Sequence, residues 1–201
     1  MRQGTDPKML RALSRRLQLL FGGGGVLLFC FAIWQYSEMR HFQATENGRL
    51  EEALRDKVAT PSAPSISPAP SISPQEKTTS RKAGAVVGRI EIPRLNLSAV
   101  VLEGSDSRVL DLGVGRIPQT AEPGEAGNVV LGGHRDTFFR PLNEIRGGDS
   151  INIVTAQRSY KYTVDWMKVV EPEDTAVLKA TPERSLTLVT CYPFHFIGPA
   201  P

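Results

Sequence analysis

A cysteine and a histidine each follow an apolar run, far apart in the sequence. Cys191 ends the run Thr187–Cys191, and His134 follows the run Val129–Gly133. A thiol is a good nucleophile only as thiolate, and a neighbouring imidazolium favours that form. If the ends of these two predicted strands are neighbours in space, Cys191 would be a nucleophile and His134 its acid–base partner.

The spacing of these residues leaves other interpretations open. A lone cysteine is most often a small buried hydrophobe, and His134 could be a loop histidine that is bonded to the backbone. His195 is a rival partner four residues after Cys191, although in a short loop it would more easily point away from the thiol. No metal site is expected, because one cysteine and two scattered histidines lack ligand spacing. A solvated loop is favoured over a calcium site for the acids Asp149, Glu171, Glu173 and Asp174.

Short apolar runs separated by turn residues begin at residue 85 and predict an all-β domain. Strands are predicted over residues 86–92, 97–102, 128–131, 150–155, 160–170 and 186–191, and short helices or helical turns over residues 105–112, 138–145 and 175–180. The hairpin across residues 157–159 would place Tyr160, Tyr162, Val164 and Trp166 on one face. About seven short strands with small helices imply a barrel or a sandwich.

The N-terminal segment is predicted to be a membrane anchor. Residues 17–37 carry no charge and match the length of about 20 residues that a bilayer core requires. Basic residues precede this span against a single acid, Asp6: they are Arg2, Lys8, Arg11, Arg15 and Arg16. The positive-inside rule would keep residues 1–16 in the cytoplasm and export the remainder. Bulky Phe31, Ile33 and Trp34 argue against a cleaved signal peptide.

Two further segments separate the predicted anchor from the predicted β domain. Residues 38–57 are charged and helix-prone, which predicts a solvated juxtamembrane helix. Residues 58–84 are rich in proline and serine, which predicts an extended linker without a core. The net charge of +3 and the lack of a basic stripe beyond residue 84 give no indication of nucleic-acid binding. Cys30 lies in the apolar segment, so no disulfide with Cys191 is expected.

Four stretches of the chain resemble the sortases, membrane-bound cysteine transpeptidases of the bacterial surface. They are Ile90–Pro93, Asn128–His134, the loop Arg135–Leu142 and Thr187–Cys191. The following Tyr192-Pro193-Phe194 resembles the class D branch of the family. The resemblance covers residues 85–201. It implies a closed, eight-stranded β-barrel with short helices as the catalytic domain.

The resemblance also implies a catalytic set of cysteine, histidine and arginine. The cysteine matches Cys191 as nucleophile and the histidine matches His134 as general acid and base. The family's arginine lies on the strand after the cysteine strand, beyond Pro201, and none of the arginines of this chain matches it: neither Arg135, Arg140, Arg146 nor Arg184. We therefore expect a C-terminal truncation that lacks the last strand, with low activity. The alternative is a naturally degenerate, inactive protein.

The implied activity is cleavage of a Leu-Pro-x-Thr-Gly-like sorting signal after its threonine through a thioacyl-enzyme. Transfer to an amine acceptor would follow, either a cell-wall precursor or a pilin lysine, with no cofactor. A cysteine hydrolase on the same scaffold and a non-catalytic anchored module are the alternatives. No substrate-binding residue is predicted, and the amine acceptor is left open.

Overall fold

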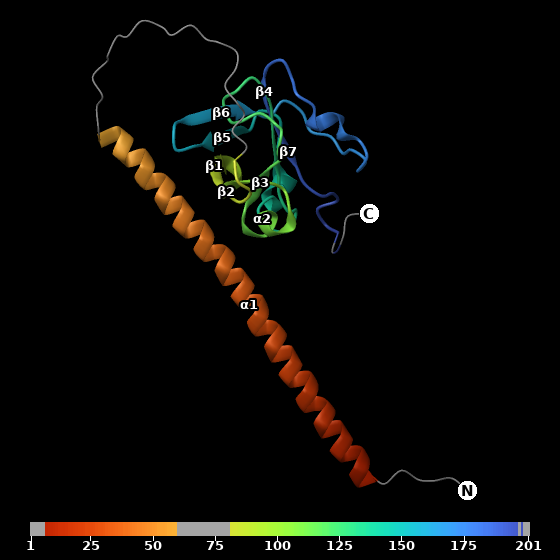
Figure 1. Cartoon of the computed structure of the whole chain (residues 1–201). Helices are drawn as coiled ribbons and strands as arrows, with labels where there is room; N and C mark the ends of the chain where they lie inside the picture. The colour runs from red at the N-terminus through yellow and green to blue at the C-terminus, as the bar shows by residue number, and fades with distance from the viewer. Residues whose placement is uncertain (1–6, 60–80, 197, 199–201) are drawn as a thin grey trace, which may run out of the picture. The chain divides into compact units, whose positions relative to one another are not determined.

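The structure, a computed structural model, describes residues 7–59, 81–196 and 198. The chain divides into two compact units, Met1–His41 and Phe42–Pro201. The long helix α1 runs from Pro7 to Ala59 and contributes to both units (Figure 1). Within α1, the stretch Leu20–Arg55 is long and apolar enough to cross a membrane. Most of the predicted linker, residues 60–80, lies outside the described residues, as do residues 1–6 of the predicted cytoplasmic tail.

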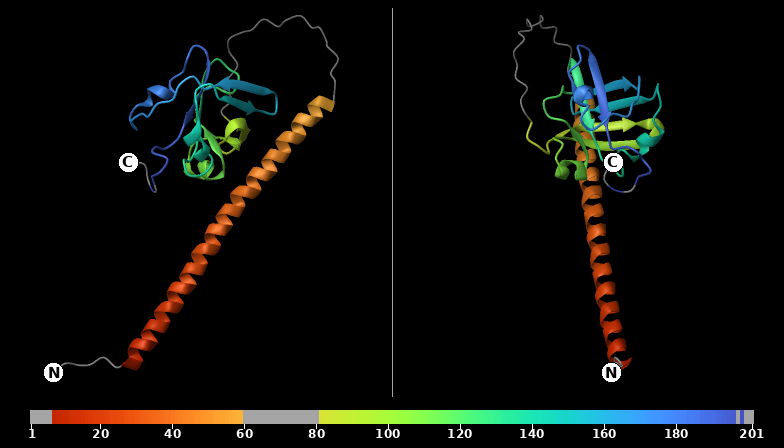
Figure 2. Two further views of the ribbon diagram at one scale, coloured as in Figure 1. Left: turned by 180° about the vertical axis from the view of Figure 1, so that it is seen from behind. Right: turned by 90° about the vertical axis from the view of Figure 1, so that its right-hand side faces the viewer.

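The described part of the second unit contains one sheet of seven strands. They are β1 (Val86–Ile92), β2 (Leu97–Glu103), β3 (Val114–Arg116), β4 (Gly127–Gly132), β5 (Ser150–Val154), β6 (Ser159–Thr163) and β7 (Arg184–Val189). Their order is β6-β5-β1-β2-β3-β4-β7, with parallel pairing only of β2 with β3 and of β4 with β7. The strands curve around a common interior (Figure 2) and form a nearly closed barrel with β6 and β7 at its two edges. The predicted all-β class is confirmed.

Short helical elements connect the strands: η1 (Pro93–Leu95), α2 (Ser107–Leu112), η2 (Arg140–Glu144) and η3 (Thr175–Leu178). Helix α2 carries the chain from β2 to the parallel strand β3, a connection that cannot be a tight turn. It begins after Asp106, whose carboxylate accepts a hydrogen bond of 3.1 Å from the Val109 amide. This bond satisfies one of the amide groups that a helix start leaves unpaired.

Two parts of the sheet differ from the sequence-based prediction. Strand β3 is short, and its central Gly115 approaches the backbone so closely that an added Cβ would lie 2.3 Å from the Gly104 carbonyl oxygen. The sequence analysis did not predict this strand, because its three residues, Val-Gly-Arg, show no apolar alternation. Strand β6 ends at Thr163 rather than continuing to residue 170. Tyr162 and Val164 pack against the core, whereas Trp166 is 62% exposed.

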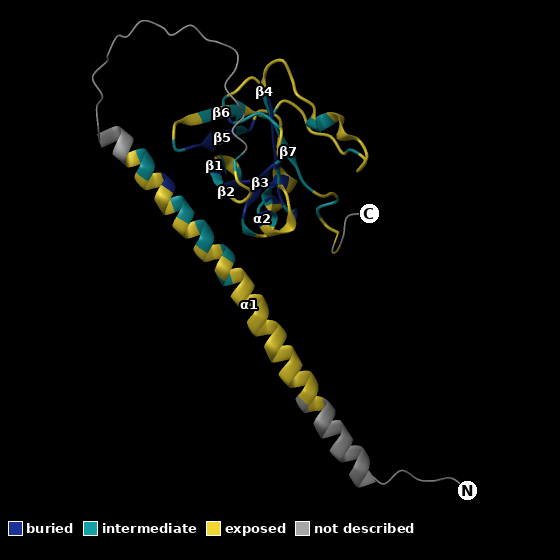
Figure 3. Ribbon diagram, in the orientation of Figure 1, coloured by how far each residue is buried: buried dark blue, intermediate teal, exposed yellow. Residues whose placement is uncertain are grey.

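The interior of the barrel is filled by large side chains from β1, β4 and β5 and from the loop after β4. The bulkiest of those fully buried are Phe139, Ile90, Ile92, Leu131 and Ile153. The buried strand segments and the exposed stretch between β6 and β7 are distinguished in Figure 3. The core therefore fixes the strands whose ends carry the candidate site.

The second unit also includes the C-terminal segment of α1, beginning at Phe42. Phe42 packs against a small second core of Val100, Leu102 and Val109. The Gln43 side chain accepts a hydrogen bond of 2.9 Å from the Val100 amide and donates one of 2.7 Å to the Leu112 carbonyl. One face of the segment predicted as a solvated helix is therefore covered by protein.

The Gln43 side chain bonds the backbone just before β2 and β3 begin to pair, where a neighbouring strand would otherwise supply the hydrogen bonds. Strands β2 and β3 pair from Val101 and Val114 onward. Just before that register, the side-chain amide of Gln43 supplies one acceptor and one donor, as a peptide group of a neighbouring strand would. Buried backbone groups need such partners. The Gln43 side chain thus continues the hydrogen bonding of β2 and β3 beyond their paired residues.

Candidate active site

The parallel pairing of β4 with β7 brings His134 and Cys191 to the same end of the sheet. The last register pair is Gly132 with Val189. Beyond it, the Gly133 amide donates a 3.1 Å hydrogen bond to the Val189 carbonyl. His134 and Cys191 each follow this last pair by two residues, so they lie in equivalent positions just past the ends of two adjacent strands. The strand register thus places Cys191 and His134 at the same end of the sheet.

Both candidate side chains are open to solvent. Cys191 is exposed, and the His134 side chain is 44% exposed. Cys191 also lies two residues past Val189, where β7 ends, rather than on the strand itself. It is therefore not the small buried hydrophobe that a lone cysteine usually is. A nucleophile that must reach a peptide carbonyl requires access of this kind.

A tight turn anchored in the core holds His134. The His134 carbonyl accepts hydrogen bonds from the amides of Thr137 and Phe139, at 3.4 and 3.1 Å. The Phe139 ring is fully buried and lies beneath Gly133, where an added Cβ would come within 2.8 Å of the ring. The glycine that precedes the histidine is therefore required by the close approach of an aromatic ring. This contact fixes where the histidine loop leaves β4.

A carboxylate from α2 lies beside the imidazole. The distance from His134 Nε2 to Asp111 Oδ1 is 3.6 Å, which is an ion-pair distance rather than a hydrogen bond. The Asp111 side chain is 69% exposed, so solvent weakens the attraction. A pair this exposed adds little to stability.

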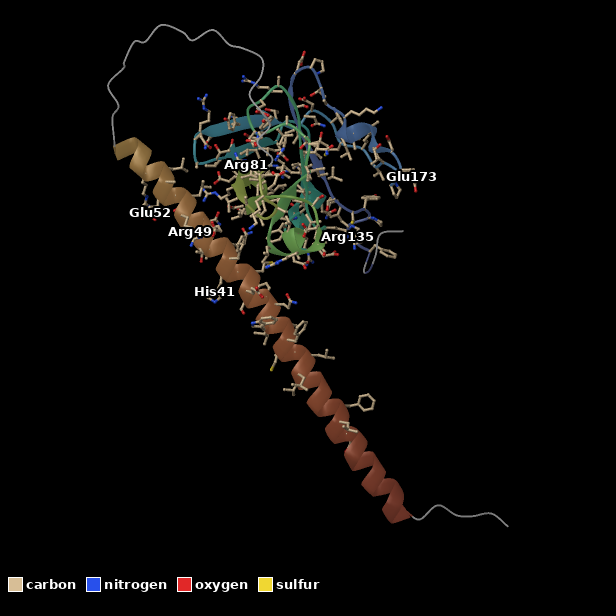
Figure 4. All side chains as sticks on the ribbon, viewed as in Figure 1. His41, Arg49, Glu52, Arg81, Arg135 and Glu173 are labelled. Atoms are coloured by element: carbon tan, nitrogen blue, oxygen red, sulfur yellow. The ribbon has the colours of Figure 1, made fainter. Side chains whose placement is uncertain are left out.

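A buried guanidinium connects the histidine loop to the segment after the cysteine. Arg135 projects from the loop that follows β4 (Figure 4), and its side chain is 2% exposed. It donates hydrogen bonds of 2.9 Å to the carbonyls of Pro193 and Gly198 and is paired with Asp136. The hydrogen bonds from Arg135 hold the pKa of the Asp136 carboxyl below its usual range, and the charge of His134 adds to this effect.

The other arginines considered from the sequence lie elsewhere in the fold. Arg140 is the exposed first residue of η2, and Arg184 begins β7 at the opposite end of that strand from Cys191. Arg146 lies in the loop before β5. Of these four arginines, Arg135 is the one that bonds the chain segment directly after the cysteine.

Two of the acidic residues considered from the sequence, Asp149 and Asp174, are engaged in local structure. Within residues 7–59, 81–196 and 198, no three His, Cys, Asp or Glu residues gather as a metal site would require. Asp149 instead accepts hydrogen bonds of 2.5 and 2.6 Å from Arg94, which lower the pKa of its carboxyl to about 2. The Asp174 carboxylate accepts a 3.1 Å hydrogen bond from the Ala176 amide at the start of η3.

Comparison with known proteins assigns this arrangement to a family. A family model described as the sortase domain matches residues 90–198, which include both His134 and Cys191. The chain belongs to the sortase family. Sortase D of Bacillus subtilis (strain 168) is 36% identical over 121 residues, which are 60% of this chain and 61% of that relative. The chain thus spans about three fifths of the length of this sortase.

Solved sortase structures share the fold. A Clostridium perfringens sortase D5 transpeptidase is 33% identical, with a TM-score of 0.54 over 56% of this chain and 74% of that one. A sortase C from the same species, solved with the C-terminal cell wall sorting motif, is 30% identical, with a TM-score of 0.53 over 57% of this chain and 65% of that one. The resemblance identified from four short stretches is therefore confirmed, as is the sortase-like barrel.

Sequence reasoning identified His134 and Cys191 as candidates but missed the residues around them. Arg135 was set aside because it does not match the family's arginine, although its position directly after His134 was a signal. Asp111 lies in a short amphipathic helix whose place beside the histidine depends on the β2–β3 crossover. No sequence pattern specifies that contact.

Proposed function

We propose that this sortase is a membrane-anchored cysteine transpeptidase with Cys191 as nucleophile and His134 as general acid and base. Its substrate would be an exported protein with a Leu-Pro-x-Thr-Gly-like sorting signal near its C-terminus. The support is the β4–β7 register, which sets the exposed thiol and the imidazole at equivalent strand ends. The sortase-family match over residues 90–198, which includes both residues, supports a role for this pair in cysteine transpeptidation.

The first half of the proposed reaction forms a thioacyl-enzyme. The Cys191 thiolate attacks the carbonyl carbon of the threonine in the sorting signal. The threonine–glycine C–N bond then breaks, and the leaving amine takes a proton from the His134 imidazolium. Division into two steps replaces one difficult amide exchange by two easier ones.

The second half transfers the acyl group to an amine. The acceptor nitrogen attacks the thioester and gives its proton to His134, and the C–S bond breaks to return the thiolate. A cell-wall precursor or a pilin lysine has the required amine. The family resemblance implies a third group, an arginine that would stabilise the oxyanion. Losing a donor of that kind costs about 10²–10³ in rate.

The proposed location is the cell membrane, with the N-terminus in the cytoplasm and the barrel outside. The support is the apolar stretch of α1, long enough to cross a bilayer, and the basic residues that precede it in the sequence. An extracytoplasmic barrel would meet exported proteins as they leave the membrane.

An acyl-enzyme experiment tests the proposal. The protein, in detergent, is mixed with a Leu-Pro-x-Thr-Gly peptide, and its intact mass is measured with and without triglycine. We expect an adduct of the N-terminal peptide fragment on Cys191 and a ligated product when triglycine is present. Cys191→Ala and His134→Ala should remove both species. Cys30→Ser and His195→Ala, matched controls for the second thiol and the rival imidazole, should retain them.

The other outcomes separate the alternatives. A hydrolysed peptide with no ligated product at saturating triglycine would indicate a cysteine hydrolase. The absence of any adduct in the folded protein would indicate a non-catalytic module. Adduct formation that survives in Cys191→Ala would show that the nucleophile is assigned to the wrong residue.

A further inference from the structure

The segment of α1 that belongs to the second unit, residues 42–55, has one protected side (Figure 3). Gln43, Asn47 and Leu50 follow one another at spacings of four and three residues, which places them on the same side of a helix. Leu50 is 6% exposed, and the Oδ1 atom of Asn47 is closed off from solvent. The opposite side is exposed at Gly48, Arg49 and Glu52. Half of this helix surface is therefore covered, although its sequence is rich in charge.

The barrel covers this side through contacts with β2, α2 and the turn that follows α2. Phe42 packs against the small core of Val100, Leu102 and Val109. The two hydrogen bonds of Gln43 reach the backbone of β2 and the last residue of α2. These contacts join residues that lie more than fifty positions apart in the chain.

Gly113 leaves room for the glutamine. A Cβ added at Gly113 would lie 3.3 Å from Gln43 Nε2 and 2.7 Å from the Val100 carbonyl oxygen. A side chain at this position would thus collide with the barrel backbone and crowd the Gln43 amide. An ion pair of 3.2 Å between Arg89 and Glu51 lies at the margin, where Glu51 is 54% exposed and the pair adds little. Apolar packing and backbone hydrogen bonds, rather than charge, hold the helix segment.

We propose that residues 42–55 are a docking helix that holds the barrel non-covalently, so that the barrel stays bound to α1 even when the Pro/Ser stretch between them is cut. The Pro/Ser stretch would then connect two parts that already bind one another. Its length would no longer set the distance between the barrel and the predicted membrane anchor.

The docking helix limits that distance far more closely than the Pro/Ser stretch does. A stretch of this length and composition could span several tens of Å. Phe42, in contrast, follows Ser37, the last residue of the predicted span, by five residues, which cover at most about 18 Å even when fully extended. A docked barrel therefore stays at the membrane surface. This consequence rests on the proposed location in the membrane, whereas the docking itself does not.

Cleavage of the Pro/Ser stretch separates covalent from non-covalent attachment. The full chain, in detergent, carries an affinity tag before Met1 and a protease site inserted between Pro68 and Ala69. After cleavage, the barrel fragment that remains on the affinity resin is measured over time. We expect the wild-type barrel to be retained. Gln43→Ala, whose folding before cleavage is checked by thermal unfolding, should release the barrel about 5–100-fold faster, because two backbone groups lose their partner.

Glu52→Ala is the matched control, since it makes the same truncation on the exposed side of the same helix, and it should retain the barrel as the wild type does. Immediate release of the wild-type barrel would overturn the proposal, as would equal release by Gln43→Ala and Glu52→Ala. If Gln43→Ala does not fold before cleavage, Leu50→Ala on the protected side takes its place in this comparison.

The same cleavage in lipid vesicles tests the consequence for the membrane. The wild-type barrel fragment should float with the vesicles after cleavage, and the Gln43→Ala fragment should be released. Uncut protein that does not float with vesicles would refute the proposed location and leave the docking intact. Uncut protein that floats, with a wild-type barrel that is released on cleavage both here and in detergent, would refute the docking and leave the proposed location intact.

Discussion

The hydroxyl of Thr190 donates a hydrogen bond to the carbonyl oxygen of Gly133, with 2.9 Å between the two oxygen atoms. Thr190 directly precedes Cys191, and Gly133 directly precedes His134. This bond is a side-chain continuation of the β4–β7 ladder at the place where regular pairing has ended. This hydroxyl group therefore links the residue before the thiol directly to the residue before the imidazole.

Thr190→Val should lower the acylation rate more than it lowers stability. Valine keeps the shape of threonine but cannot donate to Gly133, and a neutral hydrogen bond contributes about 1 kcal/mol. A small shift between Cys191 and His134 should cost about tenfold in rate. The rate of peptide adduct formation is measured by mass spectrometry of quenched reactions, and the free energy of unfolding is measured in urea. Thr187→Val is a matched control. Thr187 lies on β7, away from the thiol, and its hydroxyl donates a 2.8 Å hydrogen bond to Asn128 of β4, which valine cannot make. Equal rate losses in both variants would contradict the prediction.

Gly133→Ala should impair the site, whereas Gly132→Ala should be tolerated. An added Cβ at Gly133 would lie 2.8 Å from the buried Phe139 ring, while at Gly132 the nearest atom lies 4.0 Å away. The collision should cost about 1–3 kcal/mol in stability, as overpacking of a core does. Thermal unfolding and adduct formation are measured for both variants. Similar behaviour of the two alanine variants would show that Phe139 does not set the histidine loop.

The Arg94–Asp149 pair should give an acid-dependent contribution to stability. The folded pKa of Asp149 is about 2, below the ordinary value of about 3.9 for an aspartate. A depressed pKa contributes stability that is complete above the unfolded value and is lost as the pH falls through the folded value. The difference in unfolding free energy between wild type and Asp149→Asn should therefore be constant above about pH 5 and vanish near about pH 2.

Urea unfolding at several pH values checks this prediction. Arg94→Gln removes the hydrogen bonds that mainly lower the pKa of Asp149, and it should lose its difference from wild type in the same pH window. A difference that stays constant down to the lowest pH would mean that the pair contributes through packing and not through charge.

Gln43→Ala should destabilise the barrel from a position outside the strands. It leaves the amide of Val100 and the carbonyl of Leu112 without the partner described above, and Val100 is 1% exposed. Unpaired buried groups cost about 1–3 kcal/mol. Hydrogen exchange at the Val100 amide should accelerate by about the corresponding factor of 5–100. Glu52→Gln, an exposed site on the same helix, is the control, and unchanged exchange in Gln43→Ala would refute the prediction.

The sequence predicted those features that depend on local pattern. The strand at residues 86–92 was found with the predicted bounds, because its buried apolar residues alternate with half-buried polar ones such as Arg89 and Glu91. Cys191 and His134 were identified because each follows an apolar run. Strand β3, Arg135 and Gln43 depend on neighbours that are distant in sequence, and no local periodicity encodes them. Strand β6 was predicted too long because the apolar residues Trp166, Met167 and Val169 are exposed rather than packed.

The Gln43 contact has a consequence for how the barrel is completed during folding. Its two partners follow it by 57 and 69 residues, so the helix segment leaves the ribosome long before β2 and α2 exist to cover it. Contacts of such sequence separation carry a large loop-closure cost and form late. A polypeptide that starts at the Pro/Ser stretch would complete folding without Gln43, so the Val100 amide and the Leu112 carbonyl would lack this partner. A synthetic peptide of residues 42–55 should then bind it in trans and restore protection to Val100.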